Sequence, residues 1–237
     1  MKTTLIVLKF ANKFGAKLIT VWFLMGFAFL SGAIQAYAVT DIYYSIGTST
    51  ADLKTGSPNL TISGGVATLD VAQTGNIGVG DVITYRGTAL KVYIKSVVNN
   101  TTFVVQTATG ATPGDYYSSV TSIKRVFNDI ATAESGSPGA SYLNTSNLVT
   151  GNKTLTWVCY NDGPFNVSTD ISISGWTTDS TRYITLTVAG ASQVASGRSQ
   201  RHTGIAGTGG VIEVQSGVTD LITISQAYTR VEWLEID

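Results

Sequence analysis

Short apolar runs alternate with turn residues from about residue 39 to the end of the chain. The runs are rich in Val, Ile, Thr and Tyr and are separated by Gly, Asn, Asp and Ser, a pattern typical of strands rather than helices. Between residues 57 and 120, Ser63-Gly64-Gly65 divides two such runs and predicts a hairpin turn. About six short strands are expected here, which indicates a small β barrel or sandwich. The clearest are at 59–62, 66–69, 79–85, 90–97 and 102–107.

The C-terminal half, residues 121–237, has a different pattern. Ser122 is a plausible N-cap, and apolar residues at helical spacing predict one helix over 123–134. The strands expected after it begin regularly, the last three at ten-residue intervals, and no hairpin turns separate them. This punctuation is typical of stacked parallel coils. The expected strands are at 153–160, 170–174, 182–188, 211–215, 221–225 and 230–236.

Three sequence segments in this half resemble segments of a known family of proteins. They are the amphipathic segment 123–134, the strand sequence KTLTWVCYNDG and the later phrase YTRVEWLEID. Together they resemble the start of a right-handed parallel β-helix of the pectin-lyase-like type. Such proteins commonly open with a helix that covers the exposed end of the solenoid, and 123–134 would be that helix. The all-β fold class expected is therefore a small β barrel or sandwich-like module, with a short leading segment, over 39–120, followed by a capping helix and first coils over 121–237.

The N-terminal 38 residues have the features of a secretory signal peptide. Four lysines precede an uncharged apolar run over 18–34, and Ala36-Tyr37-Ala38 is a small-residue cleavage site. Cleavage is expected after Ala38, which predicts a secreted or cell-surface protein. The alternative is an uncleaved anchor, because residues 18–38 are long enough to span a bilayer as a helix.

Charge and composition exclude several classes of protein. Charged residues make up 13% of the chain and hydrophobic ones 43%, which rules out a disordered chain. Removing the signal peptide would remove four of the 15 basic residues and none of the 15 acidic ones, so the mature chain would carry a net charge of −4. That charge argues against nucleic acid and anionic lipid as partners. A single Cys and a single His exclude an internal disulfide and multi-His or Cys-rich metal sites, so no metal and no cofactor are expected.

Candidate ligand-binding residues are few, and no catalytic residue is assigned. The densest polar cluster of the C-terminal half contains Arg198, Arg201 and His202, where the His has no carboxylate close in sequence. Trp176 is a further candidate, because exposed aromatic rings stack on sugars, although packing is the preferred interpretation for the aromatic residues near loops and strand ends. The tyrosine pairs 43–44 and 116–117 are expected to place one ring each in the core, since neighbouring residues of a strand face opposite sides. Asp162, Asp170, Asp179 and Asp220 are scattered and are expected to serve turns. Cys159 is expected to point into the core and to be unreactive.

These observations favour an exported structural or binding protein that contacts a polysaccharide or an envelope glycan. The alternative is the N-terminal portion of a carbohydrate-active enzyme, a polysaccharide lyase or glycoside hydrolase on a β-helix, and a third possibility is a trimeric protein like a phage tail spike. About two complete coils are expected, whereas a solenoid needs roughly three repeats. The chain is therefore expected to be a fragment of a longer protein or to self-associate through the end of the solenoid.

Overall fold

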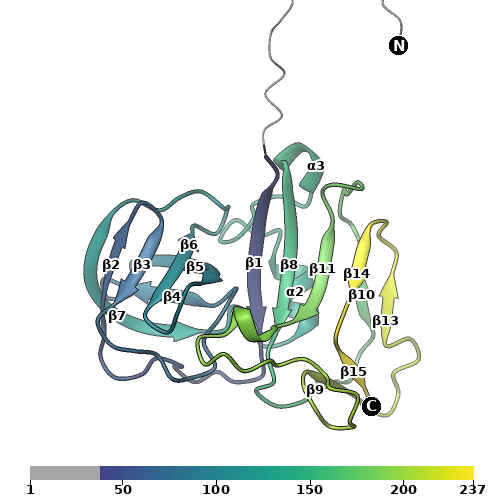
Figure 1. Cartoon of the computed structure of the whole chain (residues 1–237). Coiled ribbons are helices and arrows are strands. Elements are labelled where there is room, and N and C mark those ends of the chain that lie inside the picture. The colour runs from purple at the N-terminus through teal and green to yellow at the C-terminus, as the bar shows by residue number, and fades with distance from the viewer. Residues whose placement is uncertain (1–37) are drawn as a thin grey trace, which may run out of the picture. The chain divides into compact units, whose positions relative to one another are not determined.

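The computed structural model describes residues 38–237, which fold into a barrel and a set of parallel sheets (Figure 1). Strands dominate and helices are few, so the all-β prediction is confirmed in this coarse form. Ala38 is the first described residue, and its carbonyl oxygen accepts a hydrogen bond from the Asn152 side chain at 3.1 Å. The remainder of the expected signal peptide lies outside the described residues.

A closed barrel occupies residues 59–124, and its strands neighbour one another in the order β2-β3-β6-β5-β4-β7. The predicted hairpin is confirmed, because β2 and β3 pair antiparallel across Ser63-Gly64-Gly65. Gly64 and Gly65 have φ values of 55° and 80°, in the left-handed region that glycine adopts most easily. The strands are β2 (Asn59–Ser63), β3 (Val66–Leu69), β4 (Val82–Tyr85), β5 (Leu90–Val97), β6 (Thr102–Gln106) and β7 (Tyr116–Lys124).

The helix predicted over 123–134 is wrong in its first half. Strand β7 continues to Lys124, and the side chain of Ile123 is fully buried in the barrel core. Helix α2 (Ile130–Gly136) begins only after the chain has crossed to the second core, and its N-cap is Asp129 instead of Ser122. Phe127 and Ile130 are buried in that second core. The apolar spacing from 123 to 130 mimics a helix because these residues fill two different cores.

The remaining strands form three parallel sheets, which the chain visits in a repeating order. From β8 onward, successive strands belong to the first, second and third sheet and then to the first again. The first sheet contains β1 (Thr40–Ile46), β8 (Lys153–Cys159), β11 (Ile184–Val188) and β14 (Thr229–Val231). The second contains β9 (Phe165–Val167), β12 (Val211–Val214) and β15 (Glu235–Ile236), and the third β10 (Ile171–Ile173) and β13 (Ile222–Ile224). Two further short helices were not expected, α3 (Leu148–Gly151) and the 3₁₀ helix η1 (Ala191–Gln193).

Register aligns the inward side chains of the first sheet into columns. One column is Ile42, Leu155 and Ile184, the next Tyr44, Trp157 and Leu186, and the third Ile46, Cys159 and Val188. All nine side chains are fully buried. The inward position predicted for Cys159 is therefore confirmed, and burial raises the pKa of its thiol. Helix α2 adds Ile130 and Ala133 to the same core and contacts β10 and β1.

A buried ion cluster joins the barrel to the sheets. Arg125, just after β7, donates from Nη1 to both carboxylate oxygens of Asp81, at 2.8 and 2.7 Å. Its Nε and Nη2 donate to Asp162 at 2.7 and 2.9 Å, and the guanidinium carbon lies 3.5 Å from the ring centroid of Tyr160. The side chain of Arg125 is 1% exposed and that of Asp81 is fully buried. Burial lowers the pKa of Arg125, but the two carboxylates outweigh burial and leave the pKa raised.

Candidate functional site

The connection from β11 to β12 carries most of the predicted site residues and runs along the barrel. It begins with η1, and its backbone is bonded to the segment before β4. Val79 N donates to Gln193 O at 2.9 Å, and Ala195 N donates to Ile77 O at 2.7 Å. This loop connects two strands of the parallel sheets, and hydrogen bonds to residues of the barrel hold it in place.

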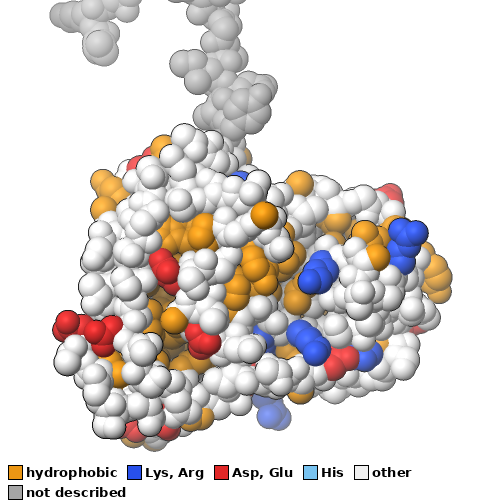
Figure 2. Space-filling view, turned by 180° about the vertical axis from the view of Figure 1, so that it is seen from behind, with side chains coloured by type: hydrophobic (Ala, Val, Ile, Leu, Met, Phe, Trp, Pro, Cys, Tyr) orange, Lys and Arg blue, Asp and Glu red, His pale blue; other side chains and the backbone are white. Residues whose placement is uncertain are grey.

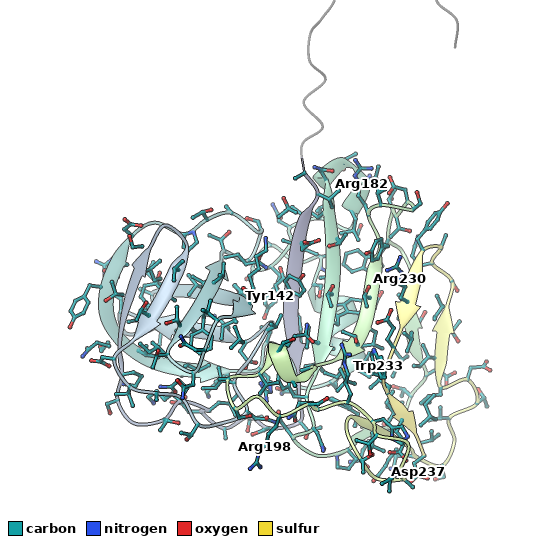
Figure 3. All side chains as sticks on the ribbon, in the orientation of Figure 1. Tyr142, Arg182, Arg198, Arg230, Trp233 and Asp237 are labelled. Carbon is teal, nitrogen blue, oxygen red and sulfur yellow. The ribbon has the colours of Figure 1, made fainter. Side chains whose placement is uncertain are left out.

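Arg198 stands at the rim of a hollow between this loop and the barrel. Figure 3 shows its side chain at the edge of the molecule, below the barrel and the sheets. The hollow has a volume of about 700 Å³, and polar groups dominate its wall. Its lining residues are Gln73, Thr74, Gly75, Asn76, Asn100, Ala195, Ser196, Arg198 and Gln200.

Arg201 faces the bend between β14 and β15 instead of this hollow. Its Nε donates to the carbonyl oxygen of Val188 at 3.1 Å, and its guanidinium carbon lies 4.7 Å from the ring centroid of Trp233. A cation over an aromatic face is attracted by the ring quadrupole. Arg201 therefore ties the end of β11 to the bend between β14 and β15.

His202 has an acidic partner that is distant in the sequence. Its Nδ1 lies 3.1 Å from Glu235 Oε2 and 3.2 Å from the carbonyl oxygen of Thr208. Glu235 reaches this position because β15 pairs with β12 in the second sheet. The same carboxylate accepts hydrogen bonds from the backbone N–H of Gly207, at 3.0 Å to each oxygen. The pair therefore fastens the 202–208 loop to β15. Both Glu235 carboxylate oxygens are used in these structural bonds.

Trp176 is not brought together with the other three candidates. Its side chain is 6% exposed and its ring meets that of Trp157 edge-on, with 6.1 Å between centroids. Its Nε1 donates to Glu134 Oε1 at 3.2 Å. Because the ring faces the core, it has no free face for a sugar, and the expectation of an exposed platform at Trp176 is corrected. Of the two tyrosine pairs, Tyr44 is fully buried whereas Tyr117 is 70% exposed.

Two of the scattered aspartates, Asp179 and Asp162, have different structural roles. Asp179 serves a turn as predicted, accepting from the backbone N–H groups of Thr181 and Arg182 at 2.8 and 2.7 Å. Asp162 does not serve only a turn, because it is a partner of the buried Arg125. Within residues 38–237 no group of three His, Cys, Asp or Glu side chains could hold a metal ion.

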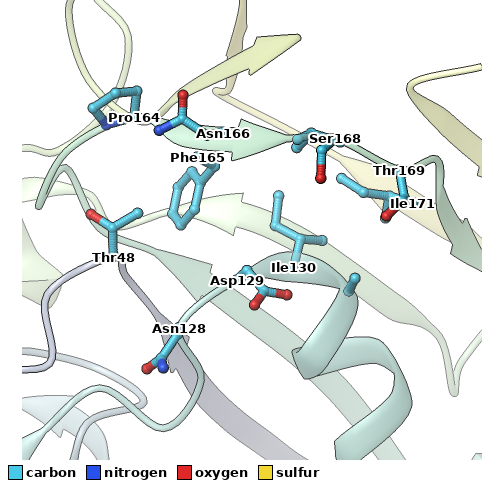
Figure 4. A pocket seen from close by; sticks show the side chains of 12 residues that line it. Thr48, Asn128, Asp129, Ile130, Pro164, Phe165, Asn166, Ser168, Thr169 and Ile171 are labelled. Carbon is cyan, nitrogen blue, oxygen red and sulfur yellow. The ribbon is translucent and has the colours of Figure 1, made fainter. Parts of the chain in front are cut away.

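A second hollow, of about 550 Å³, lies between the start of α2 and β9. Figure 4 shows the Phe165 ring and the Ile130 side chain in its wall, with Asp129 and Asn128 beside them. One Asp129 carboxylate oxygen already accepts from Thr132 N at 2.7 Å as the helix cap. Its lining residues are Thr48, Asn128, Asp129, Ile130, Ala131, Pro164, Phe165, Asn166, Val167, Ser168, Thr169 and Ile171.

The most exposed apolar surface of the parallel sheets lies at their C-terminal end. Each sheet ends there in a strand that has a β-partner on one side only: β13, β14 and β15. Trp233 is 52% exposed and Ile236 is 61% exposed. Trp233 and Tyr228 also have left-handed backbones, with φ of 67° and 54°, which is uncommon for bulky residues. We call this surface, formed by β13, β14, β15 and the bends between them, the open end.

At the opposite end of the sheets, the outer side of β1 is covered. The backbone of β1 is bonded on its outer side, where Ser45 N donates to Gly80 O and Gly47 N donates to Phe127 O, at 3.0 and 3.1 Å. Helix α2 packs beside it. On the face opposite to that of Figure 1, apolar side chains show between polar ones over the sheets, and several Lys and Arg side chains lie toward the barrel (Figure 2). Within the first sheet, β1 is therefore bonded on both sides, whereas β14 at the other end is paired on one side only.

No helix within residues 38–237 is long and apolar enough to cross a membrane. Comparison with protein-family models, with curated proteins and with solved structures finds no match to this chain. The candidate sites are therefore argued from their own chemistry alone.

Proposed function

We propose that this chain is an exported structural and binding protein of the cell surface, built on the first coils of a right-handed parallel β-helix, and that its open end is an assembly surface. The observation that carries the proposal is that exposed apolar side chains, among them Trp233 and Ile236, gather on β13, β14, β15 and the bends between them. Contiguous exposed apolar surface of this kind marks a contact with another protein.

The repeating order of strands supports the β-helix. Each complete coil contributes one strand to each sheet, and inward side chains stack from coil to coil, as in solenoid proteins. Crossovers between parallel strands of one sheet are almost always right-handed, which supports the proposed hand. Helix α2 covers the core where a solenoid needs a cap, although it begins seven residues later than the sequence pattern predicted. These features agree with the pectin-lyase-like resemblance.

The occupant we propose for the open end is a second copy of the chain. We propose that two copies meet open end to open end, so that the same exposed apolar residues of each copy face one another. If the two copies are related by a twofold axis perpendicular to the first sheet, the strands of the second copy run in the opposite direction to those of the first. Strand β14 would then lie antiparallel to β14 of the other copy, an arrangement that hydrogen-bonded sheets accept.

Charge makes this contact sensitive to salt. Residues 211–237 contain five acidic side chains and one basic side chain, Arg230. Two such ends repel each other, and salt screens the repulsion of exposed charges. We therefore expect association to become stronger as ionic strength rises, in contrast to a contact made by ion pairs.

Sedimentation velocity of the full chain tests this function. We expect a dimer whose fraction increases with protein concentration and between 0.05 and 0.5 M NaCl. Trp233→Ser is expected to weaken the dimer at least tenfold, whereas Val98→Ser, at a 62% exposed residue of the barrel, is a matched control that should leave it unchanged. A monomer under all conditions, or equal effects of the two variants, would contradict the proposal.

Export itself is tested by N-terminal sequencing of the protein recovered outside the cell. We expect the first residue to be Val39, since Ala38 ends the small-residue cleavage site. A protein that begins at Met1 and fractionates with membranes would show that the apolar segment is an anchor.

A further inference from the structure

The hollow beside Arg198 has the size and stability of a binding site. Its volume of about 700 Å³ lies within the range of small-molecule pockets, about 300–1,000 Å³. Both of its walls are held by specific bonds. Asn76 Nδ2 donates to Gln200 Oε1 at 2.7 Å across the hollow, and the Asn76 carbonyl oxygen accepts from the buried Arg125 at 3.0 Å. The side chains of Gln73 and Gln200 are 0% and 7% exposed.

The charge in the hollow comes from Arg198, and no acidic residue lines it. Among residues 38–237, each of the other five arginines has a partner. Arg125 and Arg182 pair with aspartates, and the remaining three lie over aromatic rings, those of Tyr116, Trp233 and Tyr183. For Arg198 the described residues provide neither an acidic nor an aromatic partner. Its guanidinium is therefore free to bind an anion, with a fork of N–H donors that matches carboxylate and phosphate oxygens.

The other lining groups are suited to hydroxyl-rich ligands. Amides and hydroxyls dominate the wall, and those of the exposed residues Thr74 and Asn100 can donate to or accept from a sugar hydroxyl. No aromatic ring lines the hollow, so recognition there would rest on hydrogen bonds and charge.

We propose that this hollow, between the barrel and the 195–200 loop, binds a sugar that carries one anionic group. Arg198 binds the anion, and the Thr74 hydroxyl and the Asn100 amide, at exposed residues of the same wall, bind the ring hydroxyls. The proposal deepens the binding role proposed above, but it uses none of the residues of the open end. The anionic group is a carboxylate or a phosphate, two sources of the same chemistry that the experiment below separates.

The test is a calorimetric titration of the full chain with three sugars that share one ring: D-glucuronate, D-glucose 6-phosphate and D-glucose. We expect at least one anionic sugar to bind at least tenfold more tightly than glucose. Preference for glucuronate identifies a carboxylate ligand, and preference for the phosphate ester identifies a phosphorylated one. Equal binding of all three sugars, or no binding of any, overturns the proposal.

Matched variants locate the site. Arg198→Gln is expected to reduce the preference for the anionic sugar to less than twofold, and Arg198→Lys to leave an intermediate preference, because it keeps the charge without the fork. Arg182→Gln, which removes an arginine from a turn elsewhere, is the control and should leave binding unchanged. An anion preference that survives Arg198→Gln overturns the proposal.

The titration is repeated with Trp233→Ser, the variant designed to disrupt the open end. If that variant is monomeric and still binds the anionic sugar, the hollow and the assembly surface are independent. If the chain binds no anionic sugar but does dimerise, the hollow is refuted and the assembly role stands. Thermal melting of each variant establishes that it is folded before it is titrated.

Discussion

Replacement of Arg125 by Met is expected to be among the most destabilising single changes outside the core columns. The side chain is 1% exposed and donates to two carboxylates and one carbonyl oxygen. A Met side chain is close to Arg in length, but it leaves the carboxylates of Asp81 and Asp162 buried without a counter-ion. Removing one partner of a buried ion pair typically costs about 3–5 kcal/mol, and we expect a loss of unfolding free energy in this range.

The assay is urea unfolding followed by tryptophan fluorescence. The described tryptophans all lie in the parallel sheets and their bends, so the signal reports on that part of the molecule. The comparison is the triple variant that adds Asp81→Asn and Asp162→Asn, which removes both uncompensated charges and keeps amide acceptors. We expect the triple variant to recover at least about half of the loss, because most of the cost is unpaired charge. A loss below about 1 kcal/mol for Arg125→Met, or a triple variant less stable than the single one, would refute this account of the cluster.

Three further predictions concern single residues. Cys159 should react with a thiol reagent only after denaturation, since burial both shields the sulfur and raises its pKa; rapid labelling of the folded chain would contradict its place in the core. Asp179 should titrate with a pKa of about 2 by carboxyl NMR, chiefly because the Thr181 backbone N–H donates to it. Because that pKa is depressed, the stability it contributes is complete above about pH 4 and is lost as pH falls toward 2, and a midpoint near 3.8 would show that the turn is not formed. Gly80→Ala should lower the free energy of unfolding, measured in urea, by about 2 kcal/mol or more, because φ is 91° and a Cβ would lie 2.5 Å from the backbone nitrogen of Ser45 in β1. Gly87→Ala is the control for backbone strain alone, because φ is 68° and no atom lies near the added Cβ.

Much of the strand pattern could be predicted from the sequence. The hairpin around Gly64 and the strands near Trp157 and Leu186 follow from β-branched runs and turn residues, because these signals are local. Strand β9 was missed because only three residues, Phe165–Val167, pair in a segment with little alternation. The helix was misplaced because an apolar residue at 123 does not reveal which of two cores it enters.

The site could be predicted only in part. The cluster from Arg198 to His202 was found because its polar residues are dense, but its two halves face different surfaces. Glu235 lies 33 residues from His202, and only the pairing of β12 with β15 brings it close. The wall of the hollow beside Arg198 comes from the barrel, whose packing on the 195–200 loop no local pattern indicates.

The pairing of β1 with β8 sets an order for assembly during synthesis. Asp41 and Thr154, which meet across this pair, are 113 residues apart, and the whole barrel lies between them. At ribosomal rates of about 5–20 residues per second, β1 emerges roughly 6–23 s before its partner strand. All six barrel strands lie within residues 59–124, so the barrel has time to close in that interval. Once closed, it offers Gly80 to the backbone of Ser45 and so holds β1 extended, as an edge with which β8 can pair before β11 and β14 extend the sheet.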